Sequence, residues 1–208
     1  FTYYVGFKVN SGEYKLMGLA PYGSKGSGLV AEFKEKILRE LASVKDDGSL
    51  CLNMSYFKFA TGNRTCDDEK WRELFGIPPR PAESFLTQEH ADMALAIQEV
   101  TEETMICLAK TAKKLTNADY LVLAGGVVLN CVANGRIREA GIFKDVWVQP
   151  AAGDAGGALG AALAGYHIWA GKERVPLHDG HGDGMSGAYL GPEFSDIDTM
   201  RVIRKYGA

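Results

Sequence analysis

Residues 121–130 read LVLAGGVVLN, an apolar segment that runs directly into Gly125-Gly126 and then reaches the polar Asn130. A short apolar run that ends at glycines predicts a strand. Glycines at such a turn let backbone N–H groups approach a phosphate closely. The same residues could also form a tight strand-to-helix turn in which Asn130 only caps the helix. We favour the interpretation as a nucleotide-binding turn.

A second glycine-rich turn follows the next predicted strand, which begins with DVWV at residue 145. Its sequence is QPAAGDAGGALGAAL, residues 149–163, and it places Gly153 and Asp154 at the start of a helix of small residues. The order strand, helix, strand, helix predicts parallel strands in an α/β sheet, whose ligands gather at the carboxyl ends of the strands. We therefore expect the two turns to supply two walls of one cleft. A carboxylate at Asp154 suits a cation or a ribose hydroxyl, or simple capping of the helix.

Upstream of these strands, residues 91–115 carry apolar side chains on one helical face, with Thr87 placed to cap the helix and Glu89 near its positive end. The face comprises Met93, Ile97, Val100, Leu108, Ala112 and Leu115. The pattern predicts one long amphipathic helix.

The first 86 residues predict short, mixed elements. Residues 2–9 are rich in β-branched and aromatic side chains, which is typical of a strand. Residues 30–41 have apolar side chains at helical spacing and opposite charges four residues apart, which predicts a surface amphipathic helix. The other expected features are a turn at 46–48, strands at 49–54 and 56–61, a helix at 67–75 and an irregular stretch at 77–81. We interpret residues 24–86 as an insertion or cap.

The composition excludes several classes of protein. The chain has 208 residues, 46% hydrophobic and 24% charged, which suits one large domain with a buried core. A formal net charge of -3 with scattered basic residues gives nucleic-acid binding little support. No apolar run reaches the roughly 18 to 20 residues that a membrane span requires. The four cysteines lack CxxC spacing, so we expect reduced thiols in a cytoplasmic protein.

The segment GEYKLMGLAPYG, residues 12–23, combines glycine, proline and charge in a way that helical periodicity does not explain. Composition alone is as consistent with a solvated turn followed by one helical turn as with a functional segment. Lys15 could face a phosphate or be merely solvated, and we expect Tyr14 to pack against its surroundings.

Together, GEYKLMGLAPYG, LAGGVVLNCVANGRI and QPAAGDAGGALGAAL resemble, in order and spacing, the O-carbamoyltransferase family, which includes nodulation and antibiotic-tailoring carbamoyltransferases. The resemblance covers nearly the whole chain. It implies an α/β fold of the actin-like ATPase (ribonuclease H-like) type, with residues 1–170 as the second lobe of the N-terminal domain and 171–187 as a linker. Residues 188–208 would begin a C-terminal carbamoyl-adenylate-forming domain, so we expect the chain to be truncated at both ends.

The resemblance also implies an activity. The complete enzyme would make carbamoyl-adenylate from carbamoyl phosphate and ATP and would then transfer the carbamoyl group to a hydroxyl of a small molecule or saccharide in a biosynthetic pathway. A divalent metal, Fe²⁺ or similar, would polarise the carbamoyl carbonyl. The expected partners are these substrates and the remainder of the same polypeptide, without nucleic acid or membrane, and this segment alone is expected to be inactive.

Carried over to this sequence, the resemblance implies a set of cofactor-binding residues: Glu13, Lys15, Gly18, Gly125, Gly126, Asn130 and Gly153. The first-turn glycines and Asn130 would hold the adenylate phosphate and ribose, with Glu13 and Gly18 near the nucleoside. Asp154 would be the catalytic residue and a metal ligand, completed by two histidines of the absent first lobe.

Other interpretations remain open. HDGHGD at 178–183 holds four potential metal ligands, but its glycine-rich surroundings favour a solvated loop, and we assign His90 and His167 no catalytic role. The chain could instead be the nucleotide-binding lobe of a sugar kinase or ATPase, a lobe of a tRNA threonylcarbamoyl transferase, or a nonenzymatic nucleotide-sensing module. GEYKLMGLAPYG argues against the kinase, and the net charge of -3 argues against tRNA binding.

Overall fold

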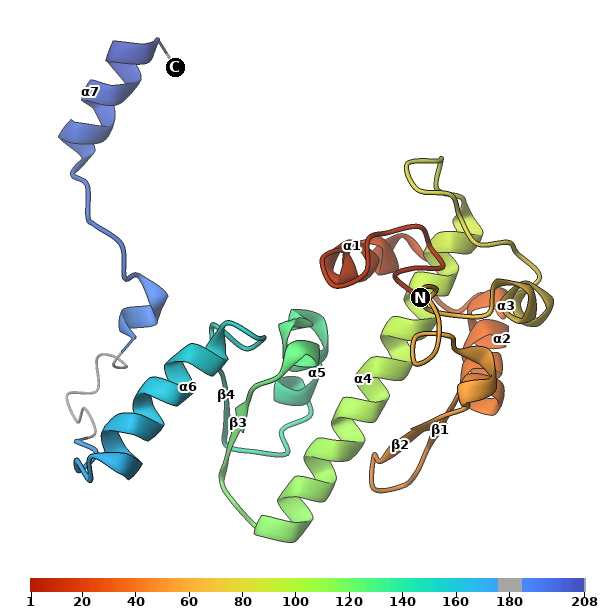
Figure 1. Ribbon diagram of the computed structural model, residues 1–208, viewed down its shortest axis with the longest axis horizontal. Helices are drawn as coiled ribbons and strands as arrows, with labels where there is room; N and C mark the ends of the chain where they lie inside the picture. Colours follow the sequence, from red (N-terminus) through yellow and green to blue (C-terminus); the bar gives the residue numbers. More distant parts are fainter. Residues whose placement is uncertain (176–184, 208) are drawn as a thin grey trace. The chain divides into compact units, whose positions relative to one another are not determined.

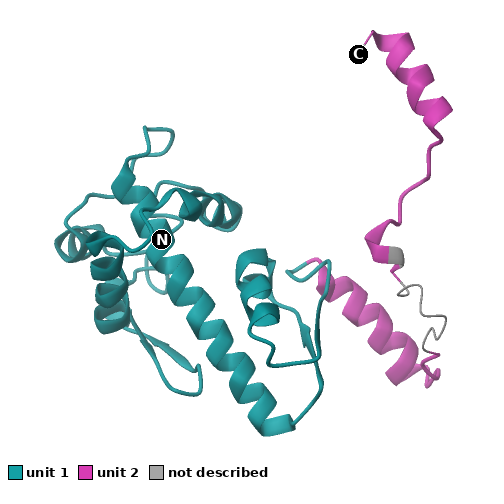
Figure 2. Ribbon diagram, turned by 180° about the vertical axis from the view of Figure 1, so that it is seen from behind, with its two compact units in different colours: residues 1–154 teal, residues 155–208 magenta. Residues whose placement is uncertain are grey.

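The computed structural model describes residues 1–175 and 185–207. The chain divides into two compact units, Phe1–Asp154 and Ala155–Ala208 (Figure 2). The elements of the first unit are α1 (Glu13–Leu19), η1 (Ala20–Tyr22), α2 (Gly28–Lys36), η2 (Ile37–Leu41), β1 (Ala42–Val44), β2 (Leu50–Leu52), η3 (Met54–Tyr56), α3 (Asp68–Phe75), α4 (Gln88–Thr116), β3 (Tyr120–Leu123), η4 (Gly126–Leu129), α5 (Cys131–Glu139) and β4 (Asp145–Val148). Those of the second are α6 (Gly156–Ala164), η5 (Gly165–Trp169), η6 (Ser186–Ala188) and α7 (Asp196–Tyr206).

The first unit is built on α4, a helix of 29 residues that contacts α1, η1, α2 and α5 (Figure 1). A capping box starts the helix, since the Thr87 N–H donates to His90 Nδ1 at 3.0 Å, and Asn117 ends it in a left-handed conformation. The predicted long helix and its cap at Thr87 are therefore confirmed. The apolar face predicted for this helix is only partly buried, because Leu108 and Leu115 are 48% and 79% exposed.

An aromatic core lies against the N-terminal half of α4. Trp71 and Phe75 of α3 stack at a centroid distance of 5.5 Å, and Phe33 of α2 meets Phe75 edge-on. The Trp71 indole N–H donates to the carbonyl of Tyr56 at 3.0 Å, so the one polar atom of this ring is satisfied. The helix predicted at 30–41 is confirmed as α2 and η2, with its Glu32–Lys36 and Glu35–Arg39 pairs.

A smaller core joins the C-terminal half of α4 to α5 and the strands that flank α5. It comprises Met105, Ala109, Ala133, Ile137 and Phe143. Strands β3 and β4 pair in parallel, with Leu121 opposite Val146, and α5 connects them. The predicted alternation of strand and helix is thus confirmed, and the mixed helices and small sheets are compatible with an α/β domain.

Two predictions about the first 61 residues are wrong. Residues 2–6 form successive turns in place of the strand predicted at 2–9, because the N–H groups of Val5 and Phe7 donate to the carbonyls of Phe1 and Thr2 at 2.9 Å. Tyr4 and Val5 are both buried, which a strand with alternating faces does not allow against one core.

The segment at 56–61 forms no strand, and β2 pairs instead with β1 in an antiparallel hairpin. The predicted turn at Asp46-Asp47-Gly48 closes this hairpin, with Gly48 at a φ of +83°. The helix predicted at 67–75 is confirmed as α3, and residues 77–81 are irregular as expected.

The second unit contains the small-residue helix α6, which continues through the π-helical η5, and the separate helix α7. The small-residue helix was predicted. The HDGHGD segment lies outside the described residues. Within the part of the chain that the structure describes, no helix is both long and apolar enough to cross a membrane.

Candidate functional site

The two glycine turns meet at one edge of the β3–β4 sheet. The Gly125 N–H donates to the carbonyl of Ala152 at 2.7 Å, and the Gln149 N–H donates to the carbonyl of Leu123 at 3.1 Å. These bonds extend the parallel pairing beyond the strands, so the carboxyl ends of β3 and β4 lie side by side. The structure therefore brings Gly125 and Gly126 together with the turn that holds Gly153 and Asp154.

The first turn requires glycine for conformation and leaves open space above it. Gly125 has a φ of +115° and a ψ of 162°, a region that residues with a Cβ rarely adopt. A Cβ built on Gly125 or Gly126 would meet no heavy atom within 4 Å, whereas one on Gly153 would lie 3.3 Å from Leu129 Cδ1. Because the Gly125 N–H is bonded to Ala152, Gly126 is the glycine of this turn whose N–H has no hydrogen bond among the described residues and is open to a ligand.

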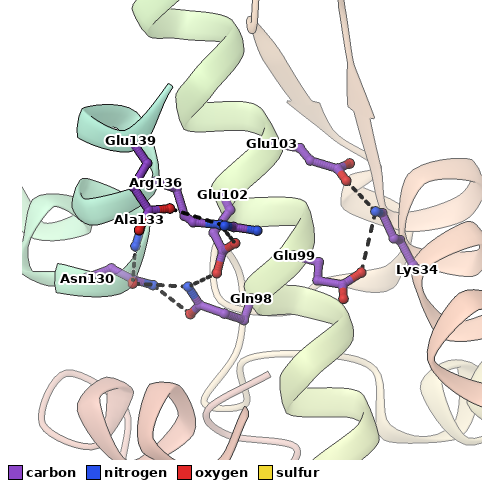
Figure 3. Close-up of polar contacts among 9 residues, drawn as sticks. All are labelled: Lys34, Gln98, Glu99, Glu102, Glu103, Asn130, Ala133, Arg136 and Glu139. Atoms are coloured by element: carbon purple, nitrogen blue, oxygen red, sulfur yellow. Dashed lines mark hydrogen bonds and ion pairs between the residues drawn. The ribbon is translucent and has the colours of Figure 1, made fainter. Parts of the chain in front are cut away.

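Asn130 holds the turn to the helices on either side of it (Figure 3). Its Oδ1 accepts from the Ala133 N–H at 3.1 Å, which makes it the N-cap of α5. Its amide also pairs with that of Gln98 on α4, at 2.8 Å in one direction and 3.1 Å in the other. The capping interpretation is confirmed, and the contact of Asn130 with a nucleotide stays a prediction.

Gln98 is a residue of this site that the sequence analysis missed. It is only 7% exposed, although it lies on a helix whose inner face is otherwise mostly apolar. A polar side chain at a buried helical position was the available signal, because such a group must find a partner.

Asn134, on the next turn of α5, supports the same loop. Its Nδ2 donates to the carbonyl of Val128 at 2.7 Å, which ties η4 to the helix. Its Oδ1 is buried and has no hydrogen-bond partner among the described residues. Because Nδ2 already donates to the Val128 carbonyl, rotating the amide to give Oδ1 a partner would break that bond.

Asp154 lies at the end of the first unit with an exposed carboxylate. Among the described residues it takes part in no hydrogen bond or ion pair, and α6 begins at an N-cap, Ala155, without side-chain capping. No group of three or more His, Cys, Asp or Glu in the described part of the chain could hold a metal ion. An accessible carboxylate oxygen fits the role of one ligand to a divalent ion that other ligands complete.

The α1 residues lie apart from these hydrogen bonds. Glu13 accepts from the Asn10 N–H at 2.8 Å, and Lys15 and Gly18 are exposed. Within the described residues, no hydrogen bond or ion pair joins any of the three to the glycine turns. Tyr14 is 64% exposed, so the expectation that it packs is wrong.

The end of the GEYKLMGLAPYG segment is fixed on α4 instead. The Ser24 N–H donates to Asp92 Oδ1 at 2.6 Å, and Gln88 donates to the carbonyl of Tyr22 at 2.9 Å. A Cβ on Gly23 would come within 2.6 Å of Leu95 Cβ, so glycine permits this close approach. Asp92 is 3% exposed and meets its acceptor needs through these neighbours.

Charged side chains of α4 hold α2 and α5 on opposite sides of it (Figure 3). Arg136 of α5 lies 3.2 Å from Glu102, and Lys34 of α2 bonds to Glu103 and lies 3.5 Å from Glu99. Burial acts to lower the pKa of Lys34, but the hydrogen bond and charge of Glu103 and the charge of Glu99 raise it above its ordinary value. A cavity of about 920 Å³ lies between α4 and α5, and its charged lining is largely engaged in these pairs.

Comparison with known proteins gives the family. A family model described as "Carbamoyltransferase N-terminus" matches residues 1–163. An uncharacterized protein of Synechocystis sp. is 51% identical over 204 residues, which is 98% of this chain and 32% of that protein. Nodulation protein NolO of Bradyrhizobium diazoefficiens is 37% identical over 153 residues, which is 73% of this chain and 24% of that protein.

A more distant relative, an uncharacterized protein of Methanocaldococcus jannaschii, is 28% identical over 207 residues, which is 99% of this chain and 30% of that protein. The chain therefore spans about a third or less of the length of these relatives. Since the family model covers most of the chain, including both glycine turns, the chain belongs to the carbamoyltransferase family and carries part of its N-terminal region.

Proposed function

We propose that the complete polypeptide is an O-carbamoyltransferase in which this chain supplies the nucleotide-facing part of an actin-like second lobe. The observation that carries the proposal is the bond from the Gly125 N–H to the carbonyl of Ala152. This bond joins two glycine turns at the carboxyl ends of parallel strands, which is where α/β sheets bind ligands. Membership of the carbamoyltransferase family supports the chemistry.

The reaction transfers the carbamoyl group from carbamoyl-adenylate to a hydroxyl. A bond forms between the acceptor oxygen and the carbamoyl carbon, the bond from that carbon to the phosphate oxygen breaks, AMP leaves and the hydroxyl proton is released. Gly126 leaves its peptide N–H open to a phosphate oxygen, whereas the N–H of Gly125 is bonded to the Ala152 carbonyl. The pairing of Asn130 with Gln98 keeps this turn in place against α4.

Asp154 is the residue of this chain that we propose as a metal ligand. Its accessible carboxylate follows the second glycine turn. A divalent ion bound there would polarise the carbamoyl carbonyl as a Lewis acid. The role of Asp154 itself is to offer a negatively charged oxygen beside the nucleotide.

Gly126→Ala tests the phosphate contact. The φ of Gly126 is not in the left-handed region and its Cβ position is empty, so alanine fits the fold but adds a methyl group where the phosphate would lie. In the complete polypeptide we expect the Kd for AMP, measured by calorimetry, to rise about tenfold or more, which is about 1.4 kcal/mol. Carbamoyl transfer should fall with it.

The matched control is Gly28→Ala at the start of α2, where an added Cβ is equally unobstructed. It should leave AMP affinity unchanged. An unaltered Kd for AMP in Gly126→Ala would show that the phosphate does not bind at this turn. Failure of the unmodified polypeptide to convert ATP and carbamoyl phosphate to carbamoyl-adenylate would remove the proposed reaction.

A further inference from the structure

Arg80 is a buried cation in the proline-rich segment before α4. Its side chain is only 8% exposed, and all its bonds go to backbone carbonyls. Nε donates to the Val5 carbonyl at 2.5 Å, Nη2 donates to the Gly6 carbonyl at 3.3 Å, and Nη1 donates to the Ser84 carbonyl. These bonds explain how the guanidinium is held, but they bring no negative charge to it.

The charge of Arg80 therefore lacks a counter-ion among the described residues. A buried charge is normally paired, because desolvation costs several kcal/mol that neutral acceptors offset only in part. A guanidinium has five N–H donors, and three bonds account for three of them. Its carbon lies 5.2 Å from the centroid of the Phe7 ring, which contributes a weak cation–π contact but no full charge.

A cavity of about 420 Å³ lies beside this guanidinium. Lys8 and Lys15 line it together with Arg80, and Glu83 is the one carboxylate among its lining residues. The other lining residues are Tyr3, Gly6, Phe7, Pro79, Pro81 and Ala82. Three cations thus surround a space large enough for a small ligand, and no ion pair of the described residues joins Glu83 to any of them.

We propose that this cavity is a binding site for a phosphate group. Arg80 supplies a fixed planar fork whose remaining N–H groups can bond two phosphate oxygens, and its position is set before the ligand arrives. Lys8 and Lys15 add mobile positive charges at the rim. The site stands on its own geometry and does not require the proposed carbamoyl transfer.

His90 at the start of α4 gives a local reporter of this charge. Burial is the main cause that lowers the pKa of His90, and the positive charge of Arg80 lowers it further, while Glu89 acts to raise it. A phosphate bound to Arg80 would neutralise its positive charge and so remove this charge's lowering effect on the His90 pKa. The pKa of His90 should therefore rise when the site is filled.

The first experiment follows the imidazole of His90 by NMR against pH in the complete polypeptide, with and without inorganic phosphate. A His90→Gln variant assigns the resonance. The proposal expects an upward shift of the His90 pKa that saturates with phosphate and is absent for the other histidines. A His90 pKa that moves neither with saturating inorganic phosphate nor with saturating AMP overturns it.

The second experiment uses the exposed lysines, whose substitution does not threaten folding. Lys8→Gln combined with Lys15→Gln should raise the Kd for inorganic phosphate about tenfold, and Lys45→Gln, an exposed lysine elsewhere on the same unit, should leave it unchanged. Arg80→Lys should raise the Kd further, since a point charge replaces the fork. Equal affinities in the double variant and the control overturn the proposal.

AMP serves as the second ligand and separates this site from the glycine turns. A shift of the His90 pKa with both AMP and inorganic phosphate supports a site for free phosphate, and a shift with AMP alone supports a site for the phosphate of a nucleotide. In Gly126→Ala the shift caused by inorganic phosphate should persist. The Arg80 site can thus stand while the nucleotide proposal fails, and the reverse also holds.

Discussion

Asn130 uses its side-chain amide within the protein. One oxygen caps α5 through Ala133 and also accepts from Gln98, and the nitrogen returns a bond to Gln98. A ligand that needs this amide must compete with both partners. We infer that Asn130 serves the site mainly by positioning the glycine turn, in which the Gly126 N–H remains for a ligand.

Asn130→Ala should loosen α5 specifically. Loss of the cap costs about 1 kcal/mol and the unpaired buried amide of Gln98 adds about 1 to 3 kcal/mol. Hydrogen exchange of α5 amides in the complete polypeptide should accelerate about 30- to 700-fold, since 1.4 kcal/mol corresponds to a factor of ten. Asn130→Ser, which keeps a capping oxygen, should accelerate exchange less.

The two substitutions distinguish the cap from the pair. Equal effects of alanine and serine would mean that the pairing with Gln98 dominates and the cap is negligible. No change in α5 exchange with either would contradict the positioning role of Asn130. Exchange in α3, which belongs to the other core, is the internal reference.

Among the helices, α3 shows how a single charge supports an element. Asp67 caps it by accepting from the Lys70 N–H at 3.3 Å, and Lys58 lies 3.1 Å from the same carboxylate. The hydrogen bond with Lys58, followed by that from the Lys70 backbone, lowers the pKa of Asp67 below its ordinary value of 3.8. The ionised form is therefore favoured by folding.

The stability that Asp67 contributes should depend on pH in a defined direction. A carboxyl with a lowered folded pKa stabilises the folded state above its unfolded pKa, and this contribution is lost as the pH falls through the folded value. Asp67→Asn keeps a capping oxygen but removes the charge. We expect exchange in α3 to be slower in the unmodified protein than in the variant near pH 7 and equal in both well below pH 3.8.

Asp46→Asn, in the hairpin turn, controls for the loss of an exposed negative charge on the same unit. It should leave α3 exchange unchanged at every pH. A difference between Asp67→Asn and the unmodified protein that does not vary with pH would assign the effect to cap geometry and exclude the charge.

The sequence predicted helices and strands well where the hydrophobic pattern is long and where an element packs against its neighbour in the sequence. The 29-residue α4 and the β3–α5–β4 unit are of this kind. Residues 2–9 were mistaken for a strand because the aromatic side chain of Tyr4 packs on Trp71, far along the chain, and not on a sheet. Similarly, the partner of β2 is β1, a segment after the predicted helix to which the sequence pattern assigned no element.

At the scale of the whole molecule, the sequence predicted the glycine turns and their meeting, because parallel strands joined by a helix must share an edge. It could not predict the pairing of Gln98 with Asn130 or the burial of Arg80. Gln98 and Asn130 are 32 positions apart, and Arg80 and Val5 are 75 positions apart, so only the tertiary fold brings each pair together. The proposed phosphate site was missed for the same reason, although Lys15 was considered.

As the proposed metal ligand, Asp154 would connect this chain to the proposed activity of the complete polypeptide. In the proposed scheme the adenylate forms in a separate domain, so Asp154→Ala should abolish carbamoyl transfer while ATP and carbamoyl phosphate are still converted to carbamoyl-adenylate. Bound metal, measured by elemental analysis, should fall in parallel, because one ligand is lost. The two readouts together separate loss of a ligand from general damage.

Asp145→Asn is the matched control, since Asp145 is an exposed carboxylate at the opposite, amino end of β4. It should change neither metal content nor transfer, because the carboxyl ends of the strands are the side on which the glycine turns meet. Retained metal in Asp154→Ala would exclude Asp154 as a ligand even if transfer falls. If Asp154→Ala also lost adenylate formation, Asp154 would be needed for the folding of the polypeptide. This outcome would contradict the division of the two reactions between domains.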